Sequence, residues 1–281
     1  MRSLKFLAVL ACAGPVLAQP AESQYTVSDS GWAYADLADL ALVAPVVVQV
    51  EVGRAVRLKG PDAAGVAPGH TRFYIAANVI SLIKGERGIP VEVGYLVDLP
   101  NTAAGRPPKV AKKSQYILLA TRIADRPGEL RLIAPDAQLA YSADTAERLR
   151  AILREATAAD AAPRITGIGR AFHVPGTLPG ESETQIFLQA ADGRPVSLSV
   201  LRRPGEQPRW SVALTEIVDD AAAPPATDTL LWYRLACTLP PALPTRSLNE
   251  AEPDQQAAIA ADYRLIKERL GPCQRNRAKR G

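Results

Sequence analysis

The chain reads TQIFLQA at residues 184–190, ADG at 191–193, RPVSLSVL at 194–201 and RWSVAL at 209–214. Apolar and polar residues alternate in the first, third and last of these pieces, which is the pattern of half-buried strands. Gly and Pro residues lie between them and mark turns. The stretch therefore predicts an antiparallel meander of three strands, around which we expect the C-terminal half to fold.

The length of the first turn decides which residues face each other in the meander. A two-residue turn would pair Leu188 with Ser197 and mix apolar and polar side chains on both faces. A three-residue turn at 191–193 pairs Leu188 with Val196 and gives Gly193 the left-handed conformation that such a turn requires. Because burial of one face fixes the register of a strand, we predict the three-residue turn.

The N-terminus has the features of an export signal. A positive start with Arg2 and Lys5, a short apolar run and a small-residue cleavage site at 16–18 predict a signal peptide over residues 1–18. Lipidation at Cys12 is the weaker alternative, because the apolar run before it is short. We therefore expect a periplasmic or secreted protein.

Charge and hydropathy argue against nucleic-acid binding and against a membrane-spanning segment. The formal net charge is +4, and removal of the leader lowers it further, so the mature chain lacks the basic footprint of a nucleic-acid-binding protein. The basic tail from Gln274 to Arg280 is short and terminal, and we interpret it as a solvated end. After the leader no segment is long and apolar enough to be a transmembrane anchor.

The first half predicts a β-barrel flanked by helices. A short helix is expected at 32–42, and a second helix at 144–157, with Asp144 as its N-cap. Between them, alternating apolar residues predict about five short strands, at 46–52, 73–83, 91–97, 116–121 and 129–133.

The second half follows an Ala-, Asp- and Pro-rich linker at 158–163. A strand at 164–174 precedes the meander. The segment Leu230–Leu239 is apolar on both faces and is interpreted as a central strand. The segment Glu250–Leu270 carries apolar residues at helical spacing before Gly271 and predicts a C-terminal helix. The predicted fold is mainly β, a β-rich α+β protein, with domains at 19–157 and 164–281.

Two cysteines remain after the leader is removed. Cys237 and Cys273 most simply form a disulfide, since the compartment is oxidising. The bond would tie the C-terminal helix to the strand predicted at 230–239. Two unrelated buried thiols are the alternative.

The first half resembles a known family. The pieces VVVQV at 46–50, FYIAANVISLIKG at 73–85, VEV at 91–93 and QYILLA at 115–120 resemble secreted bacterial domains with a metalloproteinase-inhibitor or netrin-like OB barrel. The resemblance covers roughly residues 32–155 and implies an OB-like barrel. The inhibitors of that family reach a metal through an N-terminal Cys, which this half lacks, so inhibition is not implied. The whole chain resembles uncharacterised exported alphaproteobacterial proteins, which implies a location and no activity.

Catalytic motifs are weak in this sequence. It holds no nucleophile elbow, no His-Glu-x-x-His pair and no phosphate-binding loop ending in Lys-Ser or Lys-Thr. His173, Glu181 and Glu183 lie close in sequence and are the alternative site of an envelope hydrolase, although solvated acids on a Gly-Pro loop are the more common structure. We predict no cofactor and no bound metal.

One face of the meander is a candidate ligand site. With the three-residue turn, amide and hydroxyl side chains gather around one aromatic ring and are suited to a sugar or a peptide. A solvated sheet face is the simpler interpretation of the same pattern. We expect a non-catalytic envelope protein that binds a protein or glycan partner, or else a carbohydrate-binding module. The candidate residues are Gln185, Phe187, Gln189, Ser197, Ser199, Ser211 and Thr215.

Overall fold

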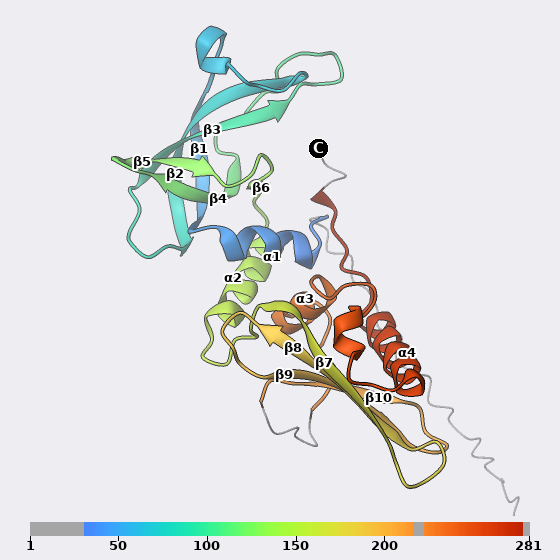
Figure 1. The fold of residues 1–281 in the computed structure, drawn as a ribbon. Helices are drawn as coiled ribbons and strands as arrows, with labels where there is room; N and C mark the ends of the chain where they lie inside the picture. Colours follow the sequence, from blue (N-terminus) through green and yellow to red (C-terminus); the bar gives the residue numbers. More distant parts are fainter. Residues whose placement is uncertain (1–30, 216–221, 278–281) are drawn as a thin grey trace, which may run out of the picture.

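The computed structural model describes residues 31–215 and 222–277, so the predicted signal peptide and Cys12 lie outside the described residues. A closed barrel of five strands is followed by a separate antiparallel sheet and a C-terminal helix. Figure 1 shows the barrel and the second sheet at opposite ends, with helices between them. The mainly β fold class predicted from the sequence is confirmed.

The barrel strands follow the order β1-β2-β3-β5-β4, and pairing of β4 with β1 closes it. β3 and β5 pair in parallel, while the other neighbours are antiparallel. All five predicted strands are present, and the OB-like barrel is confirmed. A short strand, β6, pairs with β4 beyond the closure. The bounds are β1 Val46–Arg57, β2 His70–Lys84, β3 Glu92–Pro100, β4 Gln115–Ile123, β5 Arg126–Leu132 and β6 Gln138–Ala140.

Alternation along the strands fills the barrel. Val46, Val48, Val50 and Val52 of β1 are all buried and belong to a cluster that also contains Tyr95 of β3. Every second residue of an extended strand points to the same side, so a row of valines faces inward. A one-turn 3-10 helix, Gly60–Ala63, lies in the loop between β1 and β2.

Two helices flank the barrel in sequence, α1 (Tyr34–Val43) and α2 (Ala143–Thr157), and both were predicted. The predicted N-cap of α2 is wrong. Ser142 has extended backbone angles, and its side chain accepts a hydrogen bond from the Thr145 amide at 3.1 Å. Asp144 lies inside the first turn, where a carboxylate favours the helix dipole without capping the chain.

The second sheet has the strand order β10-β9-β8-β7, and its predicted register is confirmed. Leu188 faces Val196, Ile186 faces Leu198, and Gly193 has a φ of 75°. The strands are β7 Ile165–Pro175, β8 Ser182–Ala190, β9 Val196–Arg202 and β10 Arg209–Ala213.

The segment predicted as a central strand at 230–239 is a helix, and that prediction is wrong. α3 spans Leu230–Ala236, and the side chain of Thr229 caps it by accepting from the Trp232 amide. Leu230, Trp232 and Leu235 are all buried. α3 packs against α1, α2 and α4, and every residue of it except Arg234 is aliphatic or aromatic, so its sequence shows no single apolar stripe.

The C-terminal helix α4 (Pro253–Leu270) is confirmed and ends at Gly271, whose φ is 71°. A 3-10 helix, Thr245–Leu248, precedes it. The predicted disulfide between Cys237 and Cys273 is also confirmed, with a Cα–Cα distance of 5.0 Å. Because Cys237 is the C-cap of α3 and Cys273 follows the end of α4, the bond joins the end of one helix to the segment after another and does not tie a helix to a strand.

The described part of the chain holds two large buried clusters. One fills the barrel. The other contains residues of α1, α2, α3 and α4 together with the inner face of the second sheet, and runs from Trp32 to Leu270. The predicted linker at 158–163 therefore joins elements that share one core. The division into two domains at that linker stays a prediction.

Candidate functional site

The outer face of the second sheet collects most of the predicted ligand residues. Strand pairing sets Gln185 opposite Ser199, and Ser199 opposite Ser211. In the next row Phe187 faces Ser197. The remaining two predicted residues lie at the margins: Gln189 pairs with Gly167 of β7, and Thr215 follows the end of β10.

Exposure divides this face into two parts. Ser197 and Ser199 are only 6% and 8% exposed, so their hydroxyls are poorly placed to meet a large partner. Phe187 is 40% exposed. The aromatic part of the predicted face is therefore open, while its hydroxyl part on β9 is shielded.

Sequence reasoning missed the apolar residues that β7 adds to the same face. Phe172 pairs with Gln185, and Val174 pairs with Glu183, so both share the side of the sheet that carries Phe187. They are 38% and 62% exposed. The sequence could have shown that Phe172 and Val174 share a face, because they are two residues apart in a predicted strand. The register shifts in β7 hid which residues of β8 they pair with. We call Phe172, Val174 and Phe187 the apolar patch.

The two aromatic rings of the apolar patch lie edge to face, with centroids 5.8 Å apart and planes at 77°. The guanidinium of Arg170 lies over the Phe172 ring at 5.6 Å and also forms an ion pair with Glu250 at 3.5 Å. The arrangement presents one ring edge and one ring face, with a cation at the margin. It is not a flat aromatic platform.

A cavity of about 680 Å³ adjoins the same face on its β9–β10 side. Ser199 and Ser211 line it, together with the guanidinium-bearing residues Arg203, Arg209 and Arg269. Glu183 lines the cavity as well, and its carboxylate accepts a hydrogen bond from Gln185 at 2.8 Å. The rim of the outer face is therefore rich in arginine.

The structure separates the three residues of the alternative hydrolase site. His173 pairs with Thr184 and lies on the buried side of the sheet, whereas Glu183 pairs with Val174 on the outer side. The Glu181 carboxylate accepts from the Thr177 and Leu178 amides and closes its own loop. Strand alternation thus separates His173 from Glu183, and Glu181 is bonded within its own loop.

His173 instead ends a hydrogen-bonded chain that sequence reasoning missed. Its Nδ1 lies 2.9 Å from the Thr184 hydroxyl, which donates to the Asp262 carboxylate at 2.5 Å. Asp262 is fully buried and also accepts from the Arg202 guanidinium at 2.5 and 2.9 Å. The sequence signal for this buried acid was its position on the apolar stripe of the helix, among Ile259, Tyr263 and Ile266. These contacts fix α4 on the inner face of the sheet.

Over residues 31–215 and 222–277, no cluster of three His, Cys, Asp or Glu residues is arranged to hold a metal ion. In the same part of the chain, no helix is both long and apolar enough to cross a membrane. Comparison of the sequence with models of protein families and with curated proteins finds no match.

Proposed function

We propose that this is an exported, non-catalytic envelope protein that binds another protein through the apolar patch of Phe172, Val174 and Phe187. The observation that supports this most strongly is the contrast between the two faces of one sheet. The inner face is buried in the second cluster, where α4 packs against β7 and β8. On the outer face, three large apolar side chains from neighbouring strands stay exposed. Grouped apolar residues of this kind are typical of interaction sites.

Geometry favours a protein over a glycan as the partner. Sugar rings stack best on a flat aromatic surface, whereas the rings of Phe172 and Phe187 are nearly perpendicular. An edge-to-face aromatic pair beside an arginine resembles the aromatic and arginine anchors that dominate protein interfaces. The cavity lined by Arg203 and Arg209 adds positive charge at the rim and favours an acidic surface on the partner.

Export is supported by the disulfide, since disulfides persist in oxidising compartments. The separation of His173 from Glu183 supports a non-catalytic role, because the candidate acid–base groups do not converge. The resemblance of residues 32–155 to netrin-like domains stays a prediction and adds no activity to the proposal.

The test is photo-crosslinking in cells with a benzophenone amino acid at position 187. The matched control is position 96 on the barrel, because Leu96 is similarly exposed at 47%. We expect a discrete protein adduct from position 187, its loss when Phe172→Asp is added, and no adduct from position 96. Equal labelling at both positions, or no protein adduct at 187, would contradict the proposal. Retention on cell-wall polysaccharide that Phe187→Ala abolishes would instead identify a glycan-binding module.

A further inference from the structure

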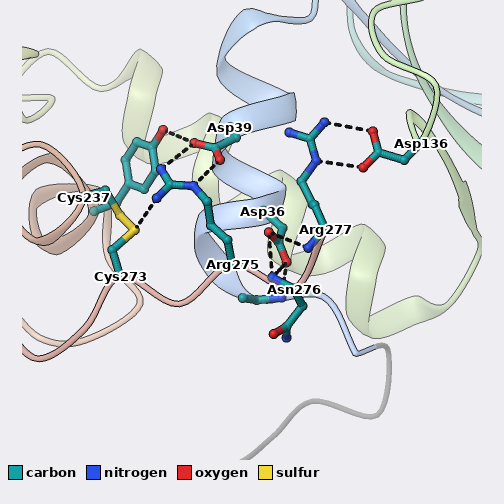
Figure 2. Close-up of polar contacts among 10 residues, drawn as sticks. Asp36, Asp39, Asp136, Cys237, Cys273, Arg275, Asn276 and Arg277 are labelled. Carbon is teal, nitrogen blue, oxygen red and sulfur yellow. Dashed lines mark hydrogen bonds and ion pairs between the residues drawn. A yellow bond between two sulfur atoms is a disulfide. The ribbon is translucent and has the colours of Figure 1, made fainter. Parts of the chain in front are cut away.

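The segment after α4 returns along the molecule and crosses α1. Its residues 273–277, which we call the strap, contact α1 and the loop before β6, as Figure 2 shows. This overturns the interpretation of the C-terminal tail as a solvated end, at least as far as Arg277. Gly271, with its left-handed φ of 71°, and Pro272 separate the strap from α4.

Three carboxylates hold the strap. Asp36, fully buried on α1, accepts hydrogen bonds from the backbone amides of Asn276 and Arg277. Asp136 accepts both arms of the Arg277 guanidinium at 2.8 Å. The strap thus joins the end of the C-terminal half to the first helix and to the barrel.

The third carboxylate, Asp39, connects the strap to the disulfide. It accepts from Arg275 at 2.7 and 3.2 Å and from the Tyr233 hydroxyl at 2.7 Å. Burial alone would raise the pKa of Asp39, but these hydrogen bonds outweigh it and hold the pKa below its usual value. The carboxylate is therefore ionised and orients the guanidinium.

The remaining arm of that guanidinium points at sulfur. Nη1 of Arg275 lies 3.0 Å from Sγ of Cys273, while no described cation bonds to Sγ of Cys237. Both cysteines are partly exposed, so a small thiol can reach them. A neighbouring guanidinium stabilises a thiolate, and in thiol–disulfide exchange the sulfur that forms the more stable thiolate leaves faster.

We propose that the Cys237–Cys273 disulfide is a redox-sensitive clasp, in which Cys273 is the leaving group and reduction releases the strap. The thiolate of a dithiol attacks Sγ of Cys237, the sulfur–sulfur bond breaks, and the electron pair leaves on Sγ of Cys273 beside Arg275. The second thiol of the reductant then displaces Cys237 and forms the reductant's own disulfide. Two electrons pass to the protein, and solvent protons complete both thiols.

The contacts that remain after the disulfide is reduced are too weak to hold the strap in place. Without the covalent bond, the strap is held by the ion pairs of Arg275 and Arg277, whose partners are partly exposed, and such pairs compete poorly with water. The two amide hydrogen bonds to the buried Asp36 then remain as the strap's other anchor. The fold keeps its two cores, because no strap residue belongs to the barrel cluster and Cys273 only borders the other. Reduction would therefore expose Asp36, Asp39 and Asp136 without unfolding the barrel.

The first test uses the full mature chain and glutathione, which traps the attacked sulfur as a mixed disulfide. After a short reaction and alkylation, peptide mass spectrometry should find glutathione on Cys237 and the alkyl group on Cys273. Arg275→Gln should abolish this preference and slow the reaction by about threefold or more. Arg264→Gln, which removes an exposed arginine from α4, is the control and should change neither. Glutathione mainly on Cys273, or faster reaction of the Arg275 variant, would overturn the assignment.

The second test measures hydrogen exchange of the Asn276 and Arg277 amides, both of which donate to Asp36. Reduction, or the double substitution Cys237→Ser with Cys273→Ser, should raise their exchange at least about tenfold while β1–β5 amides stay unchanged. Unchanged protection in the fully reduced protein would overturn release. If the double variant does not fold, the reduced wild-type protein still decides. Neither test involves the apolar patch, so failure of the clasp leaves the proposed binding function separately testable.

Discussion

The two buried cores of this protein are assembled in different ways. The barrel core uses side chains from five consecutive strands, β1 to β5, within about ninety residues of chain. The second core brings α1, near the start of the described chain, against α3, α4 and a sheet that lie more than a hundred residues later. The barrel is a unit of local sequence, whereas the second core depends on both ends of the chain.

Long-range hydrogen bonds also join the helices of the second core. Tyr233 of α3 donates to Asp39 of α1, and the Leu230 amide donates to Glu155 of α2 at 2.6 Å. The Arg148 guanidinium of α2 donates to the Trp32 carbonyl at 2.9 Å. Long-range contacts carry a larger loop-closure cost than local ones, and the disulfide and the strap reinforce the core that bears this cost.

The largest expected effect comes from removing an α1 side chain from the second core. Leu37 is fully buried, and Leu37→Ala should cost about 2–5 kcal/mol. Because this N-terminal residue packs with the C-terminal elements, hydrogen exchange should increase in α1, α3 and the second sheet, and less in the barrel. Leu118→Ala in the barrel core is the matched variant and should give the opposite pattern. Loss of protection in the barrel from both variants would remove the distinction between the cores.

The buried acid on α4 comes next. Asp262→Ala removes the partner of Arg202 and Thr184, and we expect a loss of about 2–3 kcal/mol in the free energy of unfolding. Asp254→Ala, at an exposed position in the first turn of α4, is the control and should cost well under about 1 kcal/mol. Urea unfolding followed by tryptophan fluorescence measures both. Equal stability of the two variants would show that the chain from His173 to Arg202 contributes nothing.

A smaller effect is expected at the turn that sets the register of the second sheet. Gly193 has a φ of 75°, so Gly193→Val should destabilise the protein by about 1 kcal/mol or more. Gly88, in a barrel loop with open space around it and no positive φ, offers the control Gly88→Val. Thermal melts should separate the two variants. A Gly193 variant that melts with the wild type would contradict the left-handed turn.

The smallest effect is a pH dependence at Asp39. Its pKa is lowered in the folded protein, so its contribution to stability is present above the unfolded value of 3.8 and is lost as the pH falls through the lower folded value. Both partners are partly exposed, so we expect Asp39→Asn to cost only about 0.5 kcal/mol at neutral pH. The difference from wild type in urea unfolding should shrink as the pH is lowered below 3.8. A difference that grows with acid would have the wrong sign.

Local pattern was enough to predict the barrel strands, the helix α4 and the register at Leu188 and Val196, because alternation and turn chemistry act between neighbours in sequence. The same pattern failed at α3. A short helix enclosed by other elements is mostly apolar, and over seven residues its composition cannot be told from that of a buried strand. Its true environment depends on α1, nearly two hundred residues earlier.

The candidate site was predicted only where it depends on residues close in sequence. Phe187 and its neighbours on β8 and β9 follow from the hairpin, whereas Phe172 and Val174 depend on pairing across a bulged β7. The burial of Ser199 and the bonds of Asp262 depend on what covers each face of the sheet. The strap was missed because a short basic end is normally solvated, and nothing in its sequence identifies Asp36, Asp39 and Asp136 as partners.

Cleavage at the segment 158–163 tests most directly whether the second core spans both halves. A protease site inserted there and cut in the folded protein would break the chain between α2 and β7. The shared core predicts that the two fragments stay together, elute as one species in size-exclusion chromatography and keep the native circular dichroism spectrum. Two fragments that separate in buffer, each folded by itself, would contradict a core built from both ends of the chain.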